Sequence, residues 1–421
     1  MTLFKGTGAQ ILVKSLAIHG VKRASSVAGE SYLAVLDALL DYPEIQMITC
    51  RQEGGAAFMA ESWGKMTGEP GICFVTRGPG VCNASIGVHT AMQDSSPMIL
   101  FMGQVRREEN GREAFQEVNV RQVFGGLAKW ATEIEDPARI PEIVYRAFKT
   151  ATAGRPGPVV IGLPEDMLRQ VTEAELTAPY KIVTPHASAK DLNDLQALLT
   201  KAQRPLVLVG GAGWSDATCA QFIKFAESAG LPVMTSFRRQ DIFDHRHACY
   251  VGELGTGPNP KLLEKVKESD LILCVGARLD EIAMQSYTLL DAPNPKQTLI
   301  HVHPSADEIG KVYVPALAIQ AGMDSFAAAL SSVKIDGSKW KSWHDELRTI
   351  YNAWTAIGPD KLHKWDGADM TAIFAFLRDA LPKDAIITTD AGNFSGWAQR
   401  YLQYGRPGRL LAPISGAMGY N

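Results

Sequence analysis

Glu53 is the side chain in this sequence whose surroundings most favour chemistry. It is followed by a run of small and apolar residues, Gly54-Gly55-Ala56-Ala57-Phe58-Met59-Ala60. A carboxyl group removed from water has a raised pKa, which is how a glutamate comes to exchange protons near neutral pH. A plainer explanation is that Glu53 opens a helix and is stabilised by the helix dipole, which would hold its pKa down. We take Glu53 as the first catalytic candidate and keep the plainer role as its alternative.

A second motif lies shortly after this run. An apolar, β-rich stretch at 71–76 meets a Gly-Pro-Gly turn at 78–80, and Asn83 follows. The pattern predicts a strand, a tight loop, and a helix whose start is capped by Asn83. A glycine such as Gly80 lets the backbone approach a ligand closely, although a plain strand-to-helix turn also uses glycine. Gly80 and Asn83 are therefore candidate ligand-binding residues.

Together these segments resemble the amino-terminal domain of thiamin diphosphate (ThDP) enzymes of the acetolactate synthase-like family. The resemblance continues, in the family's order and spacing, over nearly the whole chain. The further segments are 91–97, 103–104, 114–117, 154–159, 390–394 and 415–420. The resemblance implies ThDP as cofactor. It also implies that Glu53 hydrogen-bonds the pyrimidine N1′ and, by exchanging a proton there, favours the imino tautomer whose N4′ takes the C2 proton.

The same resemblance implies further cofactor contacts. Gly29 and Glu30 match the family's loop near the cofactor, although Ala28 stands where the family often has proline. Gly416 matches a residue whose backbone carbonyl orients the aminopyrimidine, and Met418 matches a bulky side chain beneath the bent cofactor. A methionine in a glycine-rich turn is more often a core residue, and this remains the alternative for Met418.

Phe115 and Gln116 resemble the Phe-Gln pair that lines the substrate side of the thiazolium in acetolactate synthases, and Gln116 is a catalytic candidate. Arg112 is a candidate for binding the substrate carboxylate. The alternative is a surface turn, because 106–113 carries six charged residues and a charge run is usually a solvated face.

Missing histidines favour group transfer over simple decarboxylation. Simple 2-oxo acid decarboxylases of this superfamily have a His-His pair or a His before Ser-Pro. This chain has Gly103-Gln104 and Ser95-Ser96-Pro97 at the comparable places. Without an acid to protonate the enamine rapidly, transfer to a second acceptor is favoured.

Length and composition predict a multidomain globular protein. The chain has 421 residues, 46% of them hydrophobic, which is enough for two or three domains. A formal charge of −3 spread over 42 basic and 45 acidic residues gives no reason to expect a nucleic acid partner. We expect a cytoplasmic protein without a membrane span, because no apolar run reaches the required length of about 18 residues. The six scattered cysteines are expected to be reduced core residues.

Strand-like and helical patterns alternate along the chain and predict an α/β fold of parallel sheets covered by helices. The expected strands lie at 72–76, 98–102, 159–163, 206–209, 271–275, 298–302 and 385–389. Two stretches interrupt the alternation and predict linkers: polar residues 168–191, and Trp- and Lys-rich residues 335–366, which also contain helical patterning. By family resemblance, three doubly wound domains follow. They are a ThDP pyrimidine-binding domain at 1–170, a central Rossmann-like domain at 189–333, and the start of a diphosphate-binding domain at 360–421.

The third domain is expected to be incomplete. The family holds its metal and diphosphate with Gly-Asp-Gly followed by Asn, and no Gly-Asp-Gly occurs in this sequence. Either the chain is truncated or the protein is a variant without a metal site, and we favour truncation. We therefore predict no metal ligand within 1–421 and place the expected Mg²⁺ site outside it.

The middle domain leaves its ligand open. A strand at 206–209 runs into Gly210-Gly211-Ala212-Gly213, but Asp216 occupies the third position of a Gly-x-Gly-x-x-Gly fingerprint. The family's FAD-binding members use this domain together with segments similar to 276–280 and 301–304. FAD, ADP and an empty site all remain open.

The function that the sequence predicts is ThDP-dependent decarboxylation of a small 2-oxo acid, with transfer of the hydroxyalkyl-enamine to an acceptor. The resemblance implies a homodimer or homotetramer with active sites at the subunit interface. Alternatives within the family are the sulfoacetaldehyde acetyltransferase, oxalyl-CoA decarboxylase and cyclohexanedione hydrolase types. A non-catalytic nucleotide-binding homologue is the alternative from another class.

Overall fold

The computed structural model describes residues 2–358, 362 and 366–420. The chain folds into two compact units: unit 1 holds the residues up to Val183 together with Tyr420, and unit 2 holds Thr184–Gly419.

Unit 1 is built around six parallel strands in the order β3-β2-β4-β5-β7-β6. These strands are β2 (Arg23–Ser26), β3 (Gln46–Thr49), β4 (Gly71–Val75), β5 (Met98–Gln104), β6 (Trp130–Glu133) and β7 (Pro158–Pro164). In this sheet β3 lies on one side of β2, and the next strand along the chain, β4, lies on the other side of β2. The strand order therefore reverses between β2 and β4, and ligands of open α/β sheets bind outside the carboxyl ends of strands at such a point.

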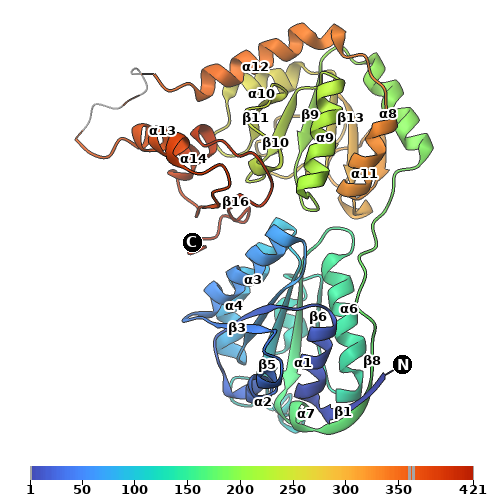
Figure 1. The fold of residues 1–421 in the computed structure, drawn as a ribbon, viewed down its shortest axis with the longest axis vertical. Coiled ribbons are helices and arrows are strands. Elements are labelled where there is room, and N and C mark those ends of the chain that lie inside the picture. Colours follow the sequence, from blue (N-terminus) through green and yellow to red (C-terminus); the bar gives the residue numbers. More distant parts are fainter. Residues whose placement is uncertain (1, 359–361, 363–365, 421) are drawn as a thin grey trace. The chain divides into compact units, whose positions relative to one another are not determined.

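Helices cover both faces of this sheet (Figure 1). On one face lie α1 (Gly8–Ile18) and α6 (Ile140–Thr152), and on the other α3 (Glu53–Thr67) and α4 (Gly78–Asp94). Strand β4 shows why: Ile72 and Phe74 pack with the first pair, and Cys73 and Val75 with the second. Successive strand residues point to opposite faces, so a strand covered on both must be apolar throughout. The shorter helices of unit 1 are η1 (Glu30–Tyr32), α2 (Leu33–Ala38), η2 (Leu39–Asp41), η3 (Arg107–Glu109), α5 (Val120–Phe124), η4 (Pro137–Arg139) and α7 (Glu165–Arg169).

The first predicted linker is partly wrong. Residues of β8 (Val171–Leu176) form an antiparallel ribbon with β1 (Thr2–Thr7), in which Thr2 lies opposite Leu176. Only Ala174 of β8 is fully buried, so the strand has the polar composition of a linker. Residues 177–188 contain neither helix nor strand.

Unit 2 has a second sheet of six parallel strands, in the order β11-β10-β9-β12-β13-β14. Counted along the chain this is 3-2-1-4-5-6, the order of dinucleotide-binding sheets. The strands are β9 (Pro205–Val209), β10 (Val233–Ser236), β11 (Tyr250–Leu254), β12 (Leu271–Val275), β13 (Thr298–His303) and β14 (Leu317–Gln320). The helices around them are α8 (Ala189–Lys201), α9 (Asp216–Ser228), η5 (Gln240–Ile242), α10 (Pro260–Glu268), η6 (Ala306–Glu308), α11 (Met323–Ala329), η7 (Leu330–Ser332) and η8 (Ser338–Trp340).

The second predicted linker contains a helix that belongs to the core. Helix α12 (Lys341–Thr355) buries Trp343 and Leu347 against the sheet, and the Trp343 indole donates to the carbonyl of Pro205 at 3.0 Å. Buried residues three and four apart are typical of one helix face, and they are the helical patterning that the sequence showed. Residues 359–361 and 363–365, including the expected start of the third domain at 360, lie outside the described residues.

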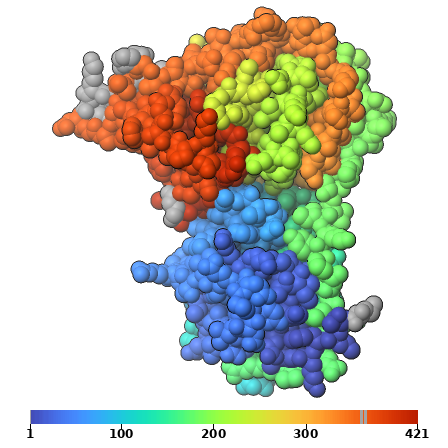
Figure 2. Space-filling view, viewed as in Figure 1, coloured from blue at the N-terminus to red at the C-terminus, as the bar shows by residue number. Residues whose placement is uncertain are grey.

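The carboxyl-terminal part of unit 2 is a small α/β segment. It contains α13 (Met370–Ala380), α14 (Ser395–Tyr401) and one parallel pair, β15 (Ile387–Thr388) with β16 (Leu410–Leu411). In Figure 2 this red segment lies directly against the yellow-green part of unit 2. There Asp241 accepts a hydrogen bond from the backbone of Arg409 at 3.1 Å, and Arg238 donates one to the carbonyl of Asp390 at 3.1 Å. The predicted fold class, parallel α/β with a short third part, is confirmed.

Two general findings bear on the sequence predictions. Within the described ranges, no helix combines the length and apolarity needed to cross a bilayer. All six cysteines carry free thiols; four are buried, Cys50 is half-buried, and Cys82 is exposed rather than in the core.

Candidate active site

Glu53 is the first residue of α3, at the carboxyl edge of the first sheet. The side chain of Gln52 caps the helix by accepting a hydrogen bond from the Gly55 N–H at 2.9 Å. The Glu53 side chain is half-buried, and its Oε2 accepts a hydrogen bond from Asn83 Nδ2 at 3.0 Å. The apolar run after Glu53 therefore does not describe its whole environment, because α4 supplies a polar neighbour that lies 30 residues away in sequence.

Asn83 is not a helix cap, contrary to the expectation from sequence. Helix α4 begins at Gly78, five residues earlier, with Arg77 as its N-cap and Pro79 in the first turn. Proline is preorganised for the first helical turn, so the Gly-Pro-Gly segment starts the helix instead of forming a loop before it. Asn83 consequently lies inside α4, where its side chain reaches Glu53.

Gly29 and Gly80 meet around one side chain, Thr76. A Cβ on Gly80 would lie 2.8 Å from Thr76 Cγ2 and 3.6 Å from Glu53 Oε1. A Cβ on Gly29 would lie 2.6 Å from Thr76 Cβ. These separations explain both glycines, because a side chain at either position would push into Thr76 or narrow the space in front of Glu53. Glu30, the other predicted loop residue, is exposed at the start of η1.

Thr76 is a site residue that sequence reasoning missed. It directly follows β4, and its Oγ1 lies 2.9 Å from Ser31 Oγ. The available signal was its position immediately before Arg77-Gly78-Pro79-Gly80. Thr76 joins the loop after β2 to the loop after β4, the two segments that flank the reversal in strand order.

The predicted substrate loop also packs against the start of α4. The Gly78 N–H donates to the backbone carbonyl of Gln116 at 2.8 Å, and Gln116 adopts a left-handed conformation with φ 66°. Phe115 is 79% exposed and Arg112 is exposed as well. The backbone of Gln116 therefore lies at the same edge of the sheet as Glu53, whereas Phe115 and Arg112 lie on the surface of this chain.

Glu117 shapes that loop, which the sequence did not indicate. Its carboxylate accepts hydrogen bonds from the backbone N–H groups of Gly111 at 2.5 Å and Ala114 at 3.0 Å. Hydrogen bonds from the backbone, Gly111 first, hold the pKa of Glu117 below its ordinary value. The loop therefore keeps a charged Glu117 at its centre.

Glu61, eight residues after Glu53 in α3, is the fully buried carboxyl of this helix. Ser96 donates to its Oε1 at 2.6 Å, and nearby Lys65 forms an ion pair of 2.6 Å with Asp94. Burial, followed by the charge of Asp94, raises the pKa of Glu61 to about 7, against the opposing effect of Lys65. Sequence reasoning missed this cluster, which fastens α3 to the end of α4.

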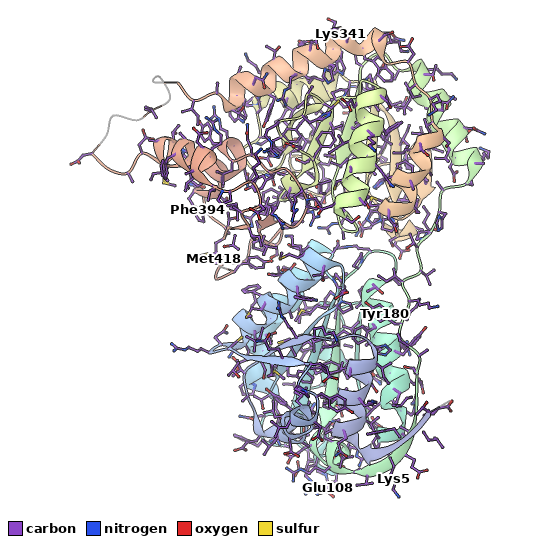
Figure 3. The ribbon with its side chains drawn as sticks, in the orientation of Figure 1. Lys5, Glu108, Tyr180, Lys341, Phe394 and Met418 are labelled. Carbon is purple, nitrogen blue, oxygen red and sulfur yellow. The ribbon has the colours of Figure 1, made fainter. Side chains whose placement is uncertain are left out.

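Gly416 and Met418 belong to unit 2. Gly416 has φ 70°, a conformation that suits glycine, and its N–H donates to the Pro413 carbonyl at 3.0 Å. Met418, which is labelled in Figure 3, has an exposed fraction of 72%, so it is not a core residue in this chain. The pairing of Gly416 and Met418 with Glu53 around one cofactor stays a prediction.

The reversal in the second sheet, between β9 and β12, is covered by large side chains. The Trp214 indole donates to the Gly210 carbonyl at 2.7 Å and is 8% exposed. A Cβ on Gly276 would lie 2.6 Å from Met323 Sδ and 3.4 Å from Trp214 Nε1. The backbone of this glycine turn is thus in contact with Trp214 and Met323, whereas a dinucleotide needs close access to it.

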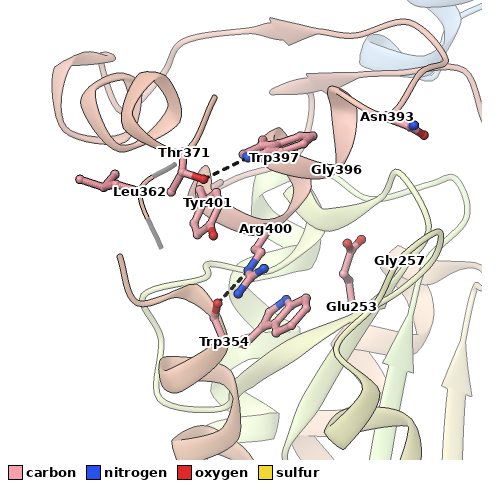
Figure 4. Close-up of a pocket in the computed structure, with 10 residues that line it drawn as sticks. All are labelled: Glu253, Gly257, Trp354, Leu362, Thr371, Asn393, Gly396, Trp397, Arg400 and Tyr401. Carbon is pink, nitrogen blue, oxygen red and sulfur yellow. Dashed lines mark hydrogen bonds between the residues drawn. The ribbon is translucent and has the colours of Figure 1, made fainter. Parts of the chain in front are cut away.

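Unit 2 also contains a cavity of about 410 Å³ beside β11 (Figure 4). Its lining residues are Glu253, Gly257, Trp354, Leu362, Thr371, Asn393, Gly396, Trp397, Arg400 and Tyr401. Arg400 stacks on Trp354, with Cζ 3.6 Å from the ring centroid, and donates to the Trp354 carbonyl at 2.9 Å. Burial raises the pKa of Glu253 to about 8, although Gln240 donates a hydrogen bond to it. No sequence motif indicated this carboxyl.

Two sequence models of known families match the chain. Residues 6–123 match the thiamine pyrophosphate enzyme N-terminal TPP binding domain, and residues 192–330 match the thiamine pyrophosphate enzyme central domain. The first match contains Glu53, Thr76, Gly80 and Asn83, and the second contains the dinucleotide-type sheet. The chain belongs to the thiamine pyrophosphate enzyme family.

Within that family the chain is similar to acetolactate synthases. It is 31% identical to the acetolactate synthase large subunit of Parasynechococcus marenigrum (strain WH8102), over 98% of this chain and 68% of that protein. It is also 31% identical to the acetolactate synthase isozyme 1 large subunit of Escherichia coli (strain K12), over 98% of this chain and 72% of that protein. The resemblance stated from sequence is confirmed.

Proposed function

We propose that this chain binds ThDP and takes part in decarboxylation of a small 2-oxo acid followed by transfer of the hydroxyalkyl unit to an acceptor. The observation that carries the proposal is the position of Glu53 at the strand reversal of the first sheet, in contact with Asn83 and beside Gly80. Similarity to acetolactate synthase large subunits supports a 2-oxo acid as the substrate class.

The residues present fit an aminopyrimidine. Oε2 of Glu53 is oriented by the Asn83 amide, and Oε1 lies beside Gly80, which has no side chain to cover it. A carboxyl held in this way can place a proton on a ring nitrogen and take it back. ThDP, when bound, supplies a nucleophilic carbon and an electron sink. The chain's own part is to orient the ring and hold that proton at Glu53.

Product formation from pyruvate tests this function. With saturating ThDP and Mg²⁺, the full-length protein should release CO₂ and form an acetoin-type or acetolactate-type product. Glu53→Gln should lower kcat by about 10² to 10⁴-fold, the usual contribution of a proton-transferring group. Unchanged turnover in a folded Glu53→Gln variant would contradict the role of Glu53. A protein that binds ThDP but turns over no 2-oxo acid would favour the non-catalytic alternative.

We further propose that the active protein is a homodimer or homotetramer, with Glu53 and Met418 of one site contributed by different subunits. The exposure of Met418 on this chain, 72%, is consistent with a contact completed by a partner. Sedimentation velocity at assay concentration should show a dimer or larger species. An active monomer would contradict the shared site.

A further inference from the structure

The described residues that line the cavity of Figure 4 all belong to unit 2. Its volume of about 410 Å³ is within the range of small-molecule sites. Open space reaches the backbone at two lining glycines, because a Cβ on Gly257 or Gly396 would meet no side chain and no neighbouring segment within 4 Å. Among the described lining residues, none is a predicted ThDP contact. The proposed function therefore leaves this cavity without a role.

Tyr401 directs an unpartnered hydroxyl into the cavity. The residue is 4% exposed and lines the cavity from α14. Its hydroxyl forms no hydrogen bond within the described residues, and they do not enclose it, in contrast to the enclosed hydroxyl of Tyr404. In Figure 4 the Tyr401 hydroxyl points towards Arg400, whose Cζ lies 5.1 Å from the centroid of the Tyr401 ring. A hydroxyl removed from water without a partner is costly, so an acceptor on a ligand would stabilise it.

Glu253 supplies a second polar atom to the cavity. Its Oε2 accepts a hydrogen bond from Gln240, whereas Oε1 has no hydrogen-bond partner among the described residues and is not enclosed by them. Burial raises the pKa of Glu253 to about 8, so the carboxyl is mostly protonated at pH 7. With Oε2 acting as acceptor, the proton of the neutral acid sits on Oε1. Glu253 therefore presents a donor to the cavity.

The groups around Glu253 keep it neutral at pH 7. The titratable groups that face it are Arg238, Tyr250, Tyr351 and Tyr404 from the surrounding elements, and Arg400 and Tyr401 across the cavity. Burial raises the pKa of Tyr250, Tyr351 and Tyr404 above its ordinary value, so these tyrosines stay uncharged. For Glu253, the effect of burial outweighs the Gln240 hydrogen bond and the charge of Arg238.

Arg400 adds a positive charge. It stacks on the Trp354 ring and donates its Nε–H to the Trp354 carbonyl at 2.9 Å, which fixes the plane of the guanidinium. Its Nη groups form no hydrogen bond or ion pair within the described residues, and Figure 4 shows no bond between Arg400 and Glu253. A guanidinium fixed in this way keeps N–H donors for a planar acceptor such as a carboxylate.

Two indoles form apolar walls. Trp354 and Trp397 are both half-buried and line the cavity. The Trp397 N–H is already bonded to Thr371 Oγ1 at 3.2 Å, so this indole offers its ring to a ligand. Aromatic walls with a few directed polar groups are the usual composition of a small-ligand site.

We propose that this cavity binds a small carboxylate with an aromatic group. The carboxylate accepts hydrogen bonds from Glu253 Oε1, from Arg400 and from the Tyr401 hydroxyl, and the aromatic group packs against Trp354 and Trp397. An amine is disfavoured, because at neutral pH these three polar groups act as donors and Arg400 carries the charge. The proposal does not depend on ThDP, since Glu53 belongs to unit 1.

Calorimetric titration of the full-length protein, without ThDP or 2-oxo acid, compares three probes of similar shape. Phenylacetate should bind saturably at pH 7. Phenylacetamide, which lacks the charge, should bind about tenfold more weakly or worse, because a charged acceptor strengthens the hydrogen bonds. 2-Phenylethylamine, a cation, should show no saturable binding. Equal affinity for the acid and the amide, or tighter binding of the amine, would overturn the proposal.

The pH dependence of binding tests the role of Glu253. Below a pKa of about 8 Glu253 donates to the ligand, and above it the ionised carboxylate repels the ligand. Wild-type affinity should therefore be about tenfold lower at pH 9 than at pH 7. Glu253→Gln keeps a donor, so it should bind within about threefold of the wild type at pH 7 and lose the pH dependence. A variant with the wild-type slope would contradict the assignment.

Two tyrosines provide a matched pair of variants. Tyr401→Phe removes only the hydroxyl that faces the cavity and should weaken phenylacetate binding by about fivefold. Tyr404→Phe removes an enclosed hydroxyl outside the cavity lining and should leave the affinity unchanged. Equal affinities of the two variants would overturn the proposal.

Three further variants locate the site. Arg400→Gln should weaken binding by about tenfold or more, and Arg400→Lys should restore part of it. Gly396→Leu places a side chain in the open space beside Gly396 and should abolish binding. Glu53→Gln should leave the affinity unchanged, so that failure of the ThDP proposal and failure of this one can be distinguished. Absence of saturable phenylacetate binding, or wild-type binding in Gly396→Leu, overturns the proposal.

Discussion

The two six-stranded sheets share a construction but differ at the point where their strand order reverses. Both are fully parallel and both carry helices on two faces. Both also have glycines in the loops at the carboxyl ends of the flanking strands. In unit 1 the glycines surround Thr76 and leave Glu53 beside Gly80. In unit 2 the corresponding turn is in contact with Trp214 and Met323. Each sheet therefore has the strand reversal at which ligands of open α/β sheets bind, and the side chains there decide whether a ligand can use it.

The candidate site at the strand reversal of the first sheet, between β2 and β4, depends on how α3 and α4 are held together. These helices contribute Glu53 and Asn83 at one end and the Lys65–Asp94 ion pair at the other, where the side chains are 2% and 0% exposed. Lys65→Met should destabilise unit 1 by about 3–5 kcal/mol, because it leaves Asp94 buried beside Glu61 without that cation. Urea unfolding measures the loss. Lys190→Met, which removes the 82%-exposed partner of Asp194, should cost about 0.5 kcal/mol or less. Equal effects of the two substitutions would show that the buried cluster does not fasten the helices.

The glycines of the first reversal should not tolerate a side chain. Gly80→Ala should destabilise the protein by about 1–3 kcal/mol, because the new Cβ would meet Thr76 Cγ2 at 2.8 Å. Gly55→Ala in α3 is the matched control. A Cβ there meets nothing within 4 Å, so alanine should stabilise the helix by about 0.5–1 kcal/mol. Thermal unfolding of the two variants should give shifts of opposite sign, and a stabilised Gly80→Ala variant would contradict the packing argument.

Glu61 should make stability fall as the pH rises. Its pKa is raised from 4.5 to about 7 in the folded chain, mainly by burial. The folded state then binds more protons than the unfolded state between these values, so the stabilisation present at low pH is lost as the pH passes through the folded pKa. Glu61→Gln cannot titrate and should flatten the dependence of the urea midpoint between about pH 4.5 and 7. An unchanged slope would mean that another group causes it.

We expect the strand reversal of the second sheet, between β9 and β12, to bind no dinucleotide. Contact of Trp214 and Met323 with the glycine turn favours the empty-site alternative over FAD or ADP. Protein dialysed against FAD should therefore show no stoichiometric flavin absorbance. One FAD bound per chain would contradict the closed turn and would show that Trp214 moves aside.

The sequence was sufficient for those features that depend on local pattern. Apolar runs such as 72–76 predicted the buried parallel strands, here β4 (Gly71–Val75), because a strand covered on both faces is apolar nearly throughout. The position of Glu53 at a helix start followed from the same kind of local pattern. Helix α12 was visible as a helical periodicity, but its burial was not, because that depends on contacts such as Trp343 with Pro205, 138 residues away.

The rest of the site depends on contacts between distant segments. Asn83 was expected to cap a helix, and it instead hydrogen-bonds Glu53 because α4 starts earlier and packs beside α3. Glu61 is buried beside Asp94, at the end of α4, and beside Ser96, in the turn after that helix. In the sequence Trp214 is only one more loop residue, whereas in the structure its indole donates a hydrogen bond to the Gly210 carbonyl. None of these contacts produces a periodic pattern in the sequence from which it could be predicted.

Proton exchange at C2 of ThDP tests the central claim most directly, because it isolates the step assigned to Glu53 from substrate binding and product release. Exchange would be followed by NMR in deuterated buffer with saturating ThDP and Mg²⁺, for the full-length wild type and its Glu53→Gln and Glu61→Gln variants. The account predicts rapid exchange in the wild type and in Glu61→Gln, and exchange at the rate of free ThDP in Glu53→Gln. Wild-type exchange in Glu53→Gln would contradict it and would remove Glu53 from the mechanism.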